Sequence, residues 1–100
     1  MIDLAPEHLA TVKALLARHV PECAVCAFGS RVKGNAKPYS DLDLAITGTA
    51  RLAPGRLAAL REAFMESDLP MRVDVVDWHA VSDTFRTAIR QNLKLIQSGD

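Results

Sequence analysis

The sequence has no excess of charge of either sign, because 12 Lys and Arg residues balance 12 Asp and Glu residues. Net charge therefore gives no argument for non-specific binding to nucleic acid or to a membrane surface. No apolar run approaches the ~20 residues that a membrane-spanning helix needs. The first residues also lack the basic and then apolar layout of a signal peptide. We therefore expect a cytoplasmic protein that contacts neither membrane nor nucleic acid directly.

Cysteine is scarce, and Cys23 and Cys26 are the only two in the chain. Their Cys-x-x-Cys spacing is compatible with zinc or redox chemistry. However, they lie in a segment that predicts a strand, where side chains three residues apart point to opposite faces. The three histidines are scattered and form no second ligand pair. Two packed thiols are therefore the preferred interpretation.

A chain of 100 residues, 49% of them hydrophobic, is long enough for one core and too short for a second substrate-binding domain. We expect residues 1–100 to form a single domain of the α/β class. The order of the elements predicts a small three-stranded sheet, whose strands need not all be parallel, flanked by helices. The predicted helices are 6–20, 54–66 and 83–97, and the predicted strands are 23–28, 41–47 and 71–76.

The last of these helices is predicted to begin at Ser82, a favourable N-cap residue. Its apolar stripe would consist of Phe85, Ile89, Leu93 and Ile96. On the opposite side Arg86, Arg90 and Lys94 recur every four residues, which indicates a solvated polar face or a docking surface.

Two carboxylates alternate with leucine in the second predicted strand. Asp41 and Asp43 are two residues apart, so a strand sends both side chains from one face with their Cα atoms about 6.6 Å apart. Carboxylates at that separation can share one hard cation or flank a pair of cations. The alternative is that both are ordinary aspartates on the solvent side of a half-exposed strand.

A third carboxylate, Asp74, lies within the valine-rich third strand. It is costly to bury an aspartate there without a partner, and a divalent cation or a nearby arginine, Arg72 or Arg31, would compensate it. Asp77 has the opposite strand parity and is expected to be a turn or cap residue. We expect Asp41, Asp43 and Asp74 to converge on one pocket.

A small-residue turn follows the first predicted strand. Gly29 has no side chain to obstruct a phosphate, and Ser30 offers a hydroxyl and, if a helix starts there, backbone N–H groups. Arg31 and the lysines after it make the next segment basic, which suits a triphosphate as well as a solvated loop. The turn would face the three aspartates.

The combined pattern resembles the minimal nucleotidyltransferase (MNT) group of the DNA polymerase β-like superfamily. The resemblance rests on Gly-Ser-x10-Asp-x-Asp, read as Gly29, Ser30, Asp41 and Asp43, together with Asp74. It implies a polymerase β-like nucleotidyltransferase fold and a site in which Asp41, Asp43 and Asp74 bind two Mg²⁺ ions and carry the catalysis. It also implies that Gly29 and Ser30, with the adjacent Arg31, bind the nucleotide ATP.

Short members of this group are typically antitoxins paired with an all-helical HEPN toxin. The resemblance therefore implies transfer of AMP from ATP to the toxin partner, releasing pyrophosphate. The alternatives are an antitoxin that neutralises its partner by binding alone and a small-molecule nucleotidyltransferase, which would need an acceptor-binding domain.

Overall fold

The computed structural model describes residues 2–99. Its strands form one four-stranded sheet in the order β3-β2-β1-β4. Strands β1 and β2 are antiparallel, β2 and β3 are parallel, and β4 is antiparallel to β1. The elements are α1 (Pro6–His19), β1 (Val25–Phe28), α2 (Ser30–Lys33), β2 (Leu42–Ile46), α3 (Pro54–Met65), β3 (Val73–Asp77), α4 (Asp83–Ile89), the 3-10 turn η1 (Arg90–Asn92) and β4 (Lys94–Gln97).

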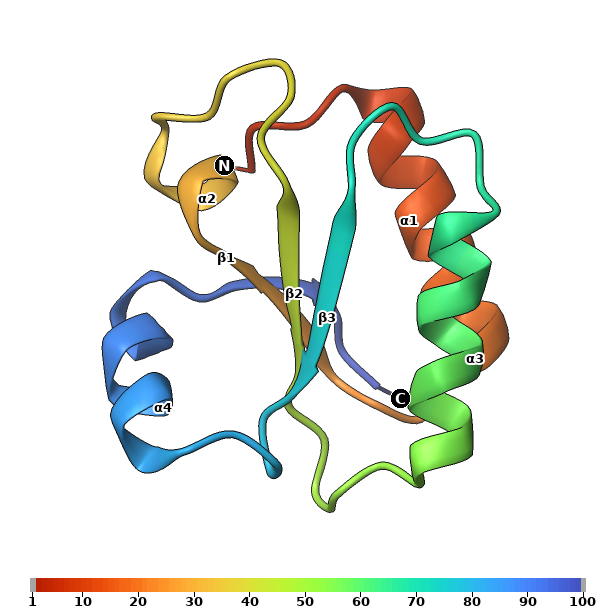
Figure 1. Ribbon diagram of the computed structural model, residues 1–100, viewed down its shortest axis with the longest axis vertical. Helices are drawn as coiled ribbons and strands as arrows, with labels where there is room; N and C mark the ends of the chain where they lie inside the picture. The colour runs from red at the N-terminus through yellow and green to blue at the C-terminus, as the bar shows by residue number, and fades with distance from the viewer. Residues whose placement is uncertain (1, 100) are drawn as a thin grey trace.

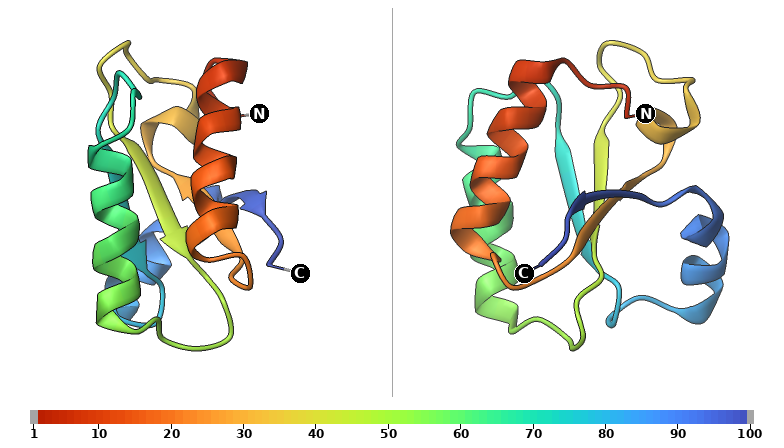
Figure 2. Two further views of the ribbon diagram at one scale, coloured as in Figure 1. Left: turned by 90° about the vertical axis from the view of Figure 1, so that its right-hand side faces the viewer. Right: turned by 180° about the vertical axis from the view of Figure 1, so that it is seen from behind.

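Helices α1 and α3 lie side by side and cover one face of the sheet (Figures 1 and 2). The hydrophobic core fills the space between these helices and the sheet. It contains Val12 and Leu16 of α1, Leu60 and Phe64 of α3, and Val25, Leu42, Leu44, Ile46 and Val75 of the strands. Between residues 2 and 99, no helix has the length and apolar character that crossing a bilayer requires.

Alternation along β2 decides which side chains leave the core. Leu42, Leu44 and Ile46 are buried against the helices, so Asp43 projects from the opposite face. On that opposite face, Phe28 of β1 meets Phe85 of α4 edge-on, with ring centroids 5.8 Å apart. The face away from α1 and α3 thus carries a carboxylate beside an aromatic contact.

The sequence prediction of a last helix over 83–97 is wrong beyond residue 89, and the sheet has four strands rather than three. Ser82 does cap α4, since its hydroxyl accepts a hydrogen bond from the Phe85 N–H at 3.1 Å. The chain then leaves the helix, and β4 pairs with the edge of β1. The Gln97 side chain fixes this end by donating to the Val20 and Cys23 carbonyl oxygens at 2.8 and 2.9 Å.

The proposed basic face of that helix is corrected as well, because Lys94 belongs to β4. Arg86 and Arg90 remain neighbours, and both lie over the ring of Trp78, 5.9 and 5.6 Å from its centroid. Arg86 also donates to the Trp78 carbonyl and pairs with Asp83. These two arginines therefore hold α4 against the end of β3.

The two cysteines are free thiols. Cys23 belongs to the hydrophobic core, and Cys26 is half-buried in β1. Burial raises the pKa of both thiols, which lowers their reactivity near neutral pH. Both observations agree with the interpretation of packed thiols.

Candidate active site

Asp43 and Asp74 occupy matching positions on two neighbouring parallel strands. They are Cα partners in the β2–β3 register, so their side chains leave the same face of the sheet from strands about 4.8 Å apart. Like charges placed directly side by side repel one another. The sheet therefore holds two carboxylates together at a cost in stability, and such a cost is typical of functional sites.

Asp41 lies one residue before β2 and is exposed, so the predicted strand began one residue too early. Asp41 nevertheless lies close enough to Asp43 for its charge to affect the pKa of that carboxyl. Burial, then the charge of Asp74, then the charge of Asp41 raise the pKa of Asp43 from its ordinary value to about 6. The three carboxylates thus belong to one electrostatic cluster centred on the half-buried Asp43.

Gly29 faces this cluster directly. Its φ of +83° lies in the region that favours glycine. A Cβ built at this position would lie 2.5 Å from Oδ2 of Asp43, closer than any side chain could approach. The preceding residue, Phe28, is the Cα partner of Asp43 across β1 and β2. The turn therefore lies against the carboxylate, as the sequence predicted.

Ser30 begins α2 directly after this glycine and is half-exposed. The first N–H groups of any helix have no acceptor within the helix. Farther along the turn, the N–H groups of Val32 and Lys33 donate to the Gly29 carbonyl at 3.0 and 3.1 Å. These bonds hold the turn in place beneath Ser30.

Arg31 has a different surrounding from the one that the sequence suggested. It is buried, and its guanidinium donates to the carbonyl oxygens of Asp3, Pro38 and Ser40 at 2.8, 3.3 and 3.0 Å. A guanidinium engaged in this way is not available to a phosphate without breaking these bonds. Its observed role is to hold the loop that leads into Asp41, and through this loop it positions the Asp41 carboxylate.

Asp77 is separate from the cluster, as its strand parity predicted. It is buried on the face covered by the helices, and its carboxylate accepts hydrogen bonds from the N–H groups of Leu52 and His79 at 2.7 and 2.9 Å. This carboxylate therefore has a structural role that satisfies two backbone donors.

The sequence profile described as "Polymerase beta, Nucleotidyltransferase" matches residues 10–100, which include the Gly29 turn and all three aspartates. The chain belongs to the polymerase beta nucleotidyltransferase family. The predicted fold class and family are thus confirmed.

Named relatives of this nucleotidyltransferase agree with that assignment. The chain is 52% identical over 96 residues to a protein of Haemophilus influenzae named "Probable protein adenylyltransferase MntA", and the match covers 96% of this chain and 84% of that protein.

Its fold is similar to a crystallised toxin–antitoxin complex with AMP-PNP, at a TM-score of 0.74 and 23% identity over 94% of this chain and 74% of that one. It is also similar to the complex of a tri-AMPylated Shewanella oneidensis HEPN toxin with its MNT antitoxin, at a TM-score of 0.68 and 22% identity over 92% of this chain and 71% of that one.

A hard divalent cation suits the donor set of this nucleotidyltransferase, because carboxylate oxygens are the ligands that Mg²⁺ prefers. Burial, together with the charges of Asp74 and Asp41, raises the pKa of Asp43, and a bound cation would offset the cost of keeping this carboxylate ionised. Among residues 2–99, however, no three His, Cys, Asp or Glu side chains already form a metal-binding group. The three aspartates therefore lie near one another, as the register of Asp43 with Asp74 and the effect of both neighbours on the pKa of Asp43 show. They do not form a preformed three-ligand metal site.

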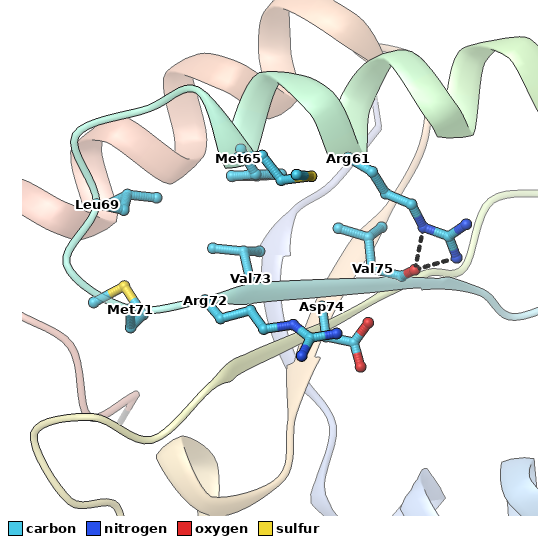
Figure 3. A pocket seen from close by; sticks show the side chains of 9 residues that line it. Arg61, Met65, Leu69, Met71, Arg72, Val73, Asp74 and Val75 are labelled. Atoms are coloured by element: carbon cyan, nitrogen blue, oxygen red, sulfur yellow. Dashed lines mark hydrogen bonds between the residues drawn. The ribbon is translucent and has the colours of Figure 1, made fainter.

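The sequence left open whether an arginine or a divalent cation compensates the negative charge of Asp74. Within the described part of the chain, the ion pairs are Arg56–Glu22 and Arg86–Asp83, so Asp74 has no cation within 4.0 Å. Asp74 is exposed and borders a cavity of about 390 Å³ between α3 and β3, with Arg72 beside it (Figure 3). No local pattern predicts this cavity, because its walls come from a helix, a loop and a strand edge.

Proposed function

We propose that this nucleotidyltransferase is the antitoxin of a HEPN/MNT pair and transfers AMP from ATP to a hydroxyl of its toxin partner. The observation that carries the proposal is the placement of Asp43 beside Asp74 with Gly29 against the Asp43 carboxylate. The 52% identity to a probable protein adenylyltransferase supports a protein as the acceptor. We also propose that residues 1–100 act as one nucleotidyltransferase domain.

The nucleotide would lie against the turn at Gly29. Because Gly29 has no side chain, Oδ2 of Asp43 can lie 2.5 Å from the position that a Cβ would take, so the turn and the carboxylate meet where the phosphates would bind. Ser30, the first residue of α2, would contribute its hydroxyl and its backbone N–H to the phosphates. Arg31 would hold the loop that ends at Asp41 through its three carbonyl contacts.

Asp41, Asp43 and Asp74 would hold two Mg²⁺ ions, and these would supply charge stabilisation to the phosphates. Asp43 is mainly ionised above pH 6, which its role as a ligand requires. The acceptor oxygen would attack the α-phosphorus, the bond to pyrophosphate would break, and the exposed carboxylate of Asp74 would receive the acceptor proton. The carboxylates thus place negative charge where a proton must leave.

Transfer of a label from α-³²P-ATP to a purified HEPN toxin in the presence of Mg²⁺ tests this proposal. We expect labelling by the wild-type protein and a loss of more than about 10³-fold in the double variant Asp41→Asn/Asp43→Asn. The variant of an exposed loop aspartate, Asp68→Asn, is the matched control and should transfer at the wild-type rate.

A second readout separates catalysis from simple covering of the toxin. The RNase activity of the toxin is measured with wild-type antitoxin and with the double variant, each with and without ATP. Neutralisation that needs ATP and intact aspartates supports the proposal. Absence of label together with full neutralisation by the double variant would establish the non-catalytic antitoxin instead.

A further inference from the structure

A groove runs along the outer edge of β3, which is one of the two edge strands of the sheet. Figure 3 shows Met65 of α3 and Val73 of β3 above the strand, and Arg72 and Asp74 below it. A molecule lying across this edge would touch an apolar wall and a catalytic carboxylate at once. The groove is thus continuous with the proposed active site.

The groove carries two arginine side chains, Arg61 and Arg72, together with the carboxylate of Asp74. Arg61 and Arg72 are both exposed, and neither has a carboxylate within 4.0 Å among residues 2–99. Arg61 is held at the strand edge, where its guanidinium donates twice to the Val75 carbonyl at 3.1 and 2.7 Å. Arg61, held at the strand edge, and the exposed Arg72 beside an apolar wall favour an occupant with a carboxylate next to an apolar side chain.

The apolar wall of the groove includes an exposed large hydrophobic residue, Met65. This residue is 84% exposed, whereas the other apolar residues of the groove are buried or half-buried. A flexible thioether adapts to an incoming side chain, and methionine is enriched in protein interfaces. The exposed apolar surface of this residue is therefore available for burial by a partner.

The order of the strands separates this groove from the nucleotide. Gly29 follows β1 and lies on the β1 side of Asp43, whereas Asp74 and the groove lie on the β3 side. A nucleotide at Gly29 and an occupant of the groove would reach the carboxylates from opposite sides. That is the arrangement that in-line attack on a phosphorus atom requires.

We propose that the groove between α3 and β3 docks the acceptor protein, by binding a segment with an apolar side chain next to a carboxylate and placing the acceptor hydroxyl at Asp74. This inference rests on the proposed function. The oxygen of the acceptor forms the new bond to the α-phosphorus, its proton leaves through Asp74, and pyrophosphate departs with the electron pair of the broken bond. The groove itself only positions the acceptor.

The test measures KM for a HEPN toxin and KM for ATP in wild-type protein, Arg72→Glu and Met65→Asp. Lys13→Glu on α1 is the control, because it makes the same charge reversal at an exposed position away from the groove. We expect KM for the toxin to rise about tenfold or more in both groove variants, with KM for ATP unchanged. Met65→Asp should also keep the wild-type kcat, because Met65 and Asp74 lie on opposite sides of the strand (Figure 3). Lys13→Glu should match the wild type.

An increase in KM for ATP instead would show that the groove holds the triphosphate and would overturn the inference. Unchanged KM for the toxin would also overturn it. Isothermal titration of the toxin without ATP separates the two proposals. If the wild type transfers no AMP while both groove variants lose toxin affinity, the proposed function fails and the docking site stands; unchanged affinity removes the docking site alone.

Discussion

Replacing Asp43 by asparagine should stabilise the metal-free protein at neutral and alkaline pH. The carboxylate of Asp43 is half-buried and lies beside the charges of Asp74 and Asp41, which together raise its pKa to about 6. In the unfolded chain the group titrates near its ordinary value of 3.8. Between these two pH values the folded state binds more protons, so stability falls as pH rises through this window.

The size of the effect follows from the shift. A difference of about two pKa units corresponds to roughly 3 kcal/mol at 1.36 kcal/mol per unit. Because the side chain is only half-buried, solvent screening reduces this figure to about 1–2 kcal/mol. For a domain of this size the variant Asp43→Asn should therefore melt roughly 5–10 °C higher than the wild type at pH 8.

Differential scanning calorimetry in EDTA at pH 4, 5, 6, 7 and 8 measures this. The difference between Asp43→Asn and wild type should be near zero at pH 4 and complete above pH 6, while Asp68→Asn should follow the wild type throughout. Addition of Mg²⁺ should raise the melting temperature of the wild type and have little effect on Asp43→Asn. A variant that is less stable than the wild type at pH 8 would refute the reasoning and show that Asp43 has a structural role.

Three further predictions follow from individual contacts. Gly29→Ala should lose about 1–3 kcal/mol more stability, measured by urea unfolding, than Gly34→Ala, because both glycines have positive φ but only the Cβ at Gly29 meets Asp43; equal losses would mean that the carboxylate moves aside freely. Arg31→Lys should lower stability by about 1–3 kcal/mol and speed amide hydrogen exchange at Asp41, because lysine cannot reproduce the hydrogen bonds of the guanidinium to three carbonyl oxygens. An unchanged exchange rate would show that Arg31 does not hold this loop. Asp77→Ala should cost about 2–4 kcal/mol in urea unfolding by leaving two backbone N–H groups without an acceptor, yet keep KM for ATP at low temperature; a raised KM would place Asp77 in the site after all.

Much of the site was predictable because its determinants are local. Glycine at a position of positive φ, a strand in which aspartate alternates with buried leucine, and the opposite parity of Asp77 all depend on neighbours one or two residues away. The same is true of the Ser82 cap. The role of Arg31 was not predictable in this way, because its carbonyl partners Asp3, Pro38 and Ser40 are brought to it by the folded loop and the N-terminal segment.

The last element shows where local pattern fails. Phe85, Ile89, Leu93 and Ile96 fit a helical period, and nothing within the segment forbids a helix to residue 97. The chain instead forms β4 because the edge of β1 offers unpaired backbone groups, and pairing with them satisfies donors and acceptors that are 67 to 72 residues away in sequence (Ala27 with Lys94, Val25 with Gln97). A helical pattern within one segment cannot predict strand pairing with a distant segment of the chain.

The sequence by itself determined the nucleotidyltransferase family and the faces from which Asp43, Asp74 and Asp77 project, since side-chain direction repeats every two residues along a strand and needs no distant partner. Only the tertiary structure decided that Asp43 and Asp74 stand in register, that Gly29 and the α3–β3 groove lie on opposite sides of them, and that a fourth strand completes the sheet. Strand order and register are fixed by hydrogen bonds and packing between segments far apart in the chain, which no local pattern specifies.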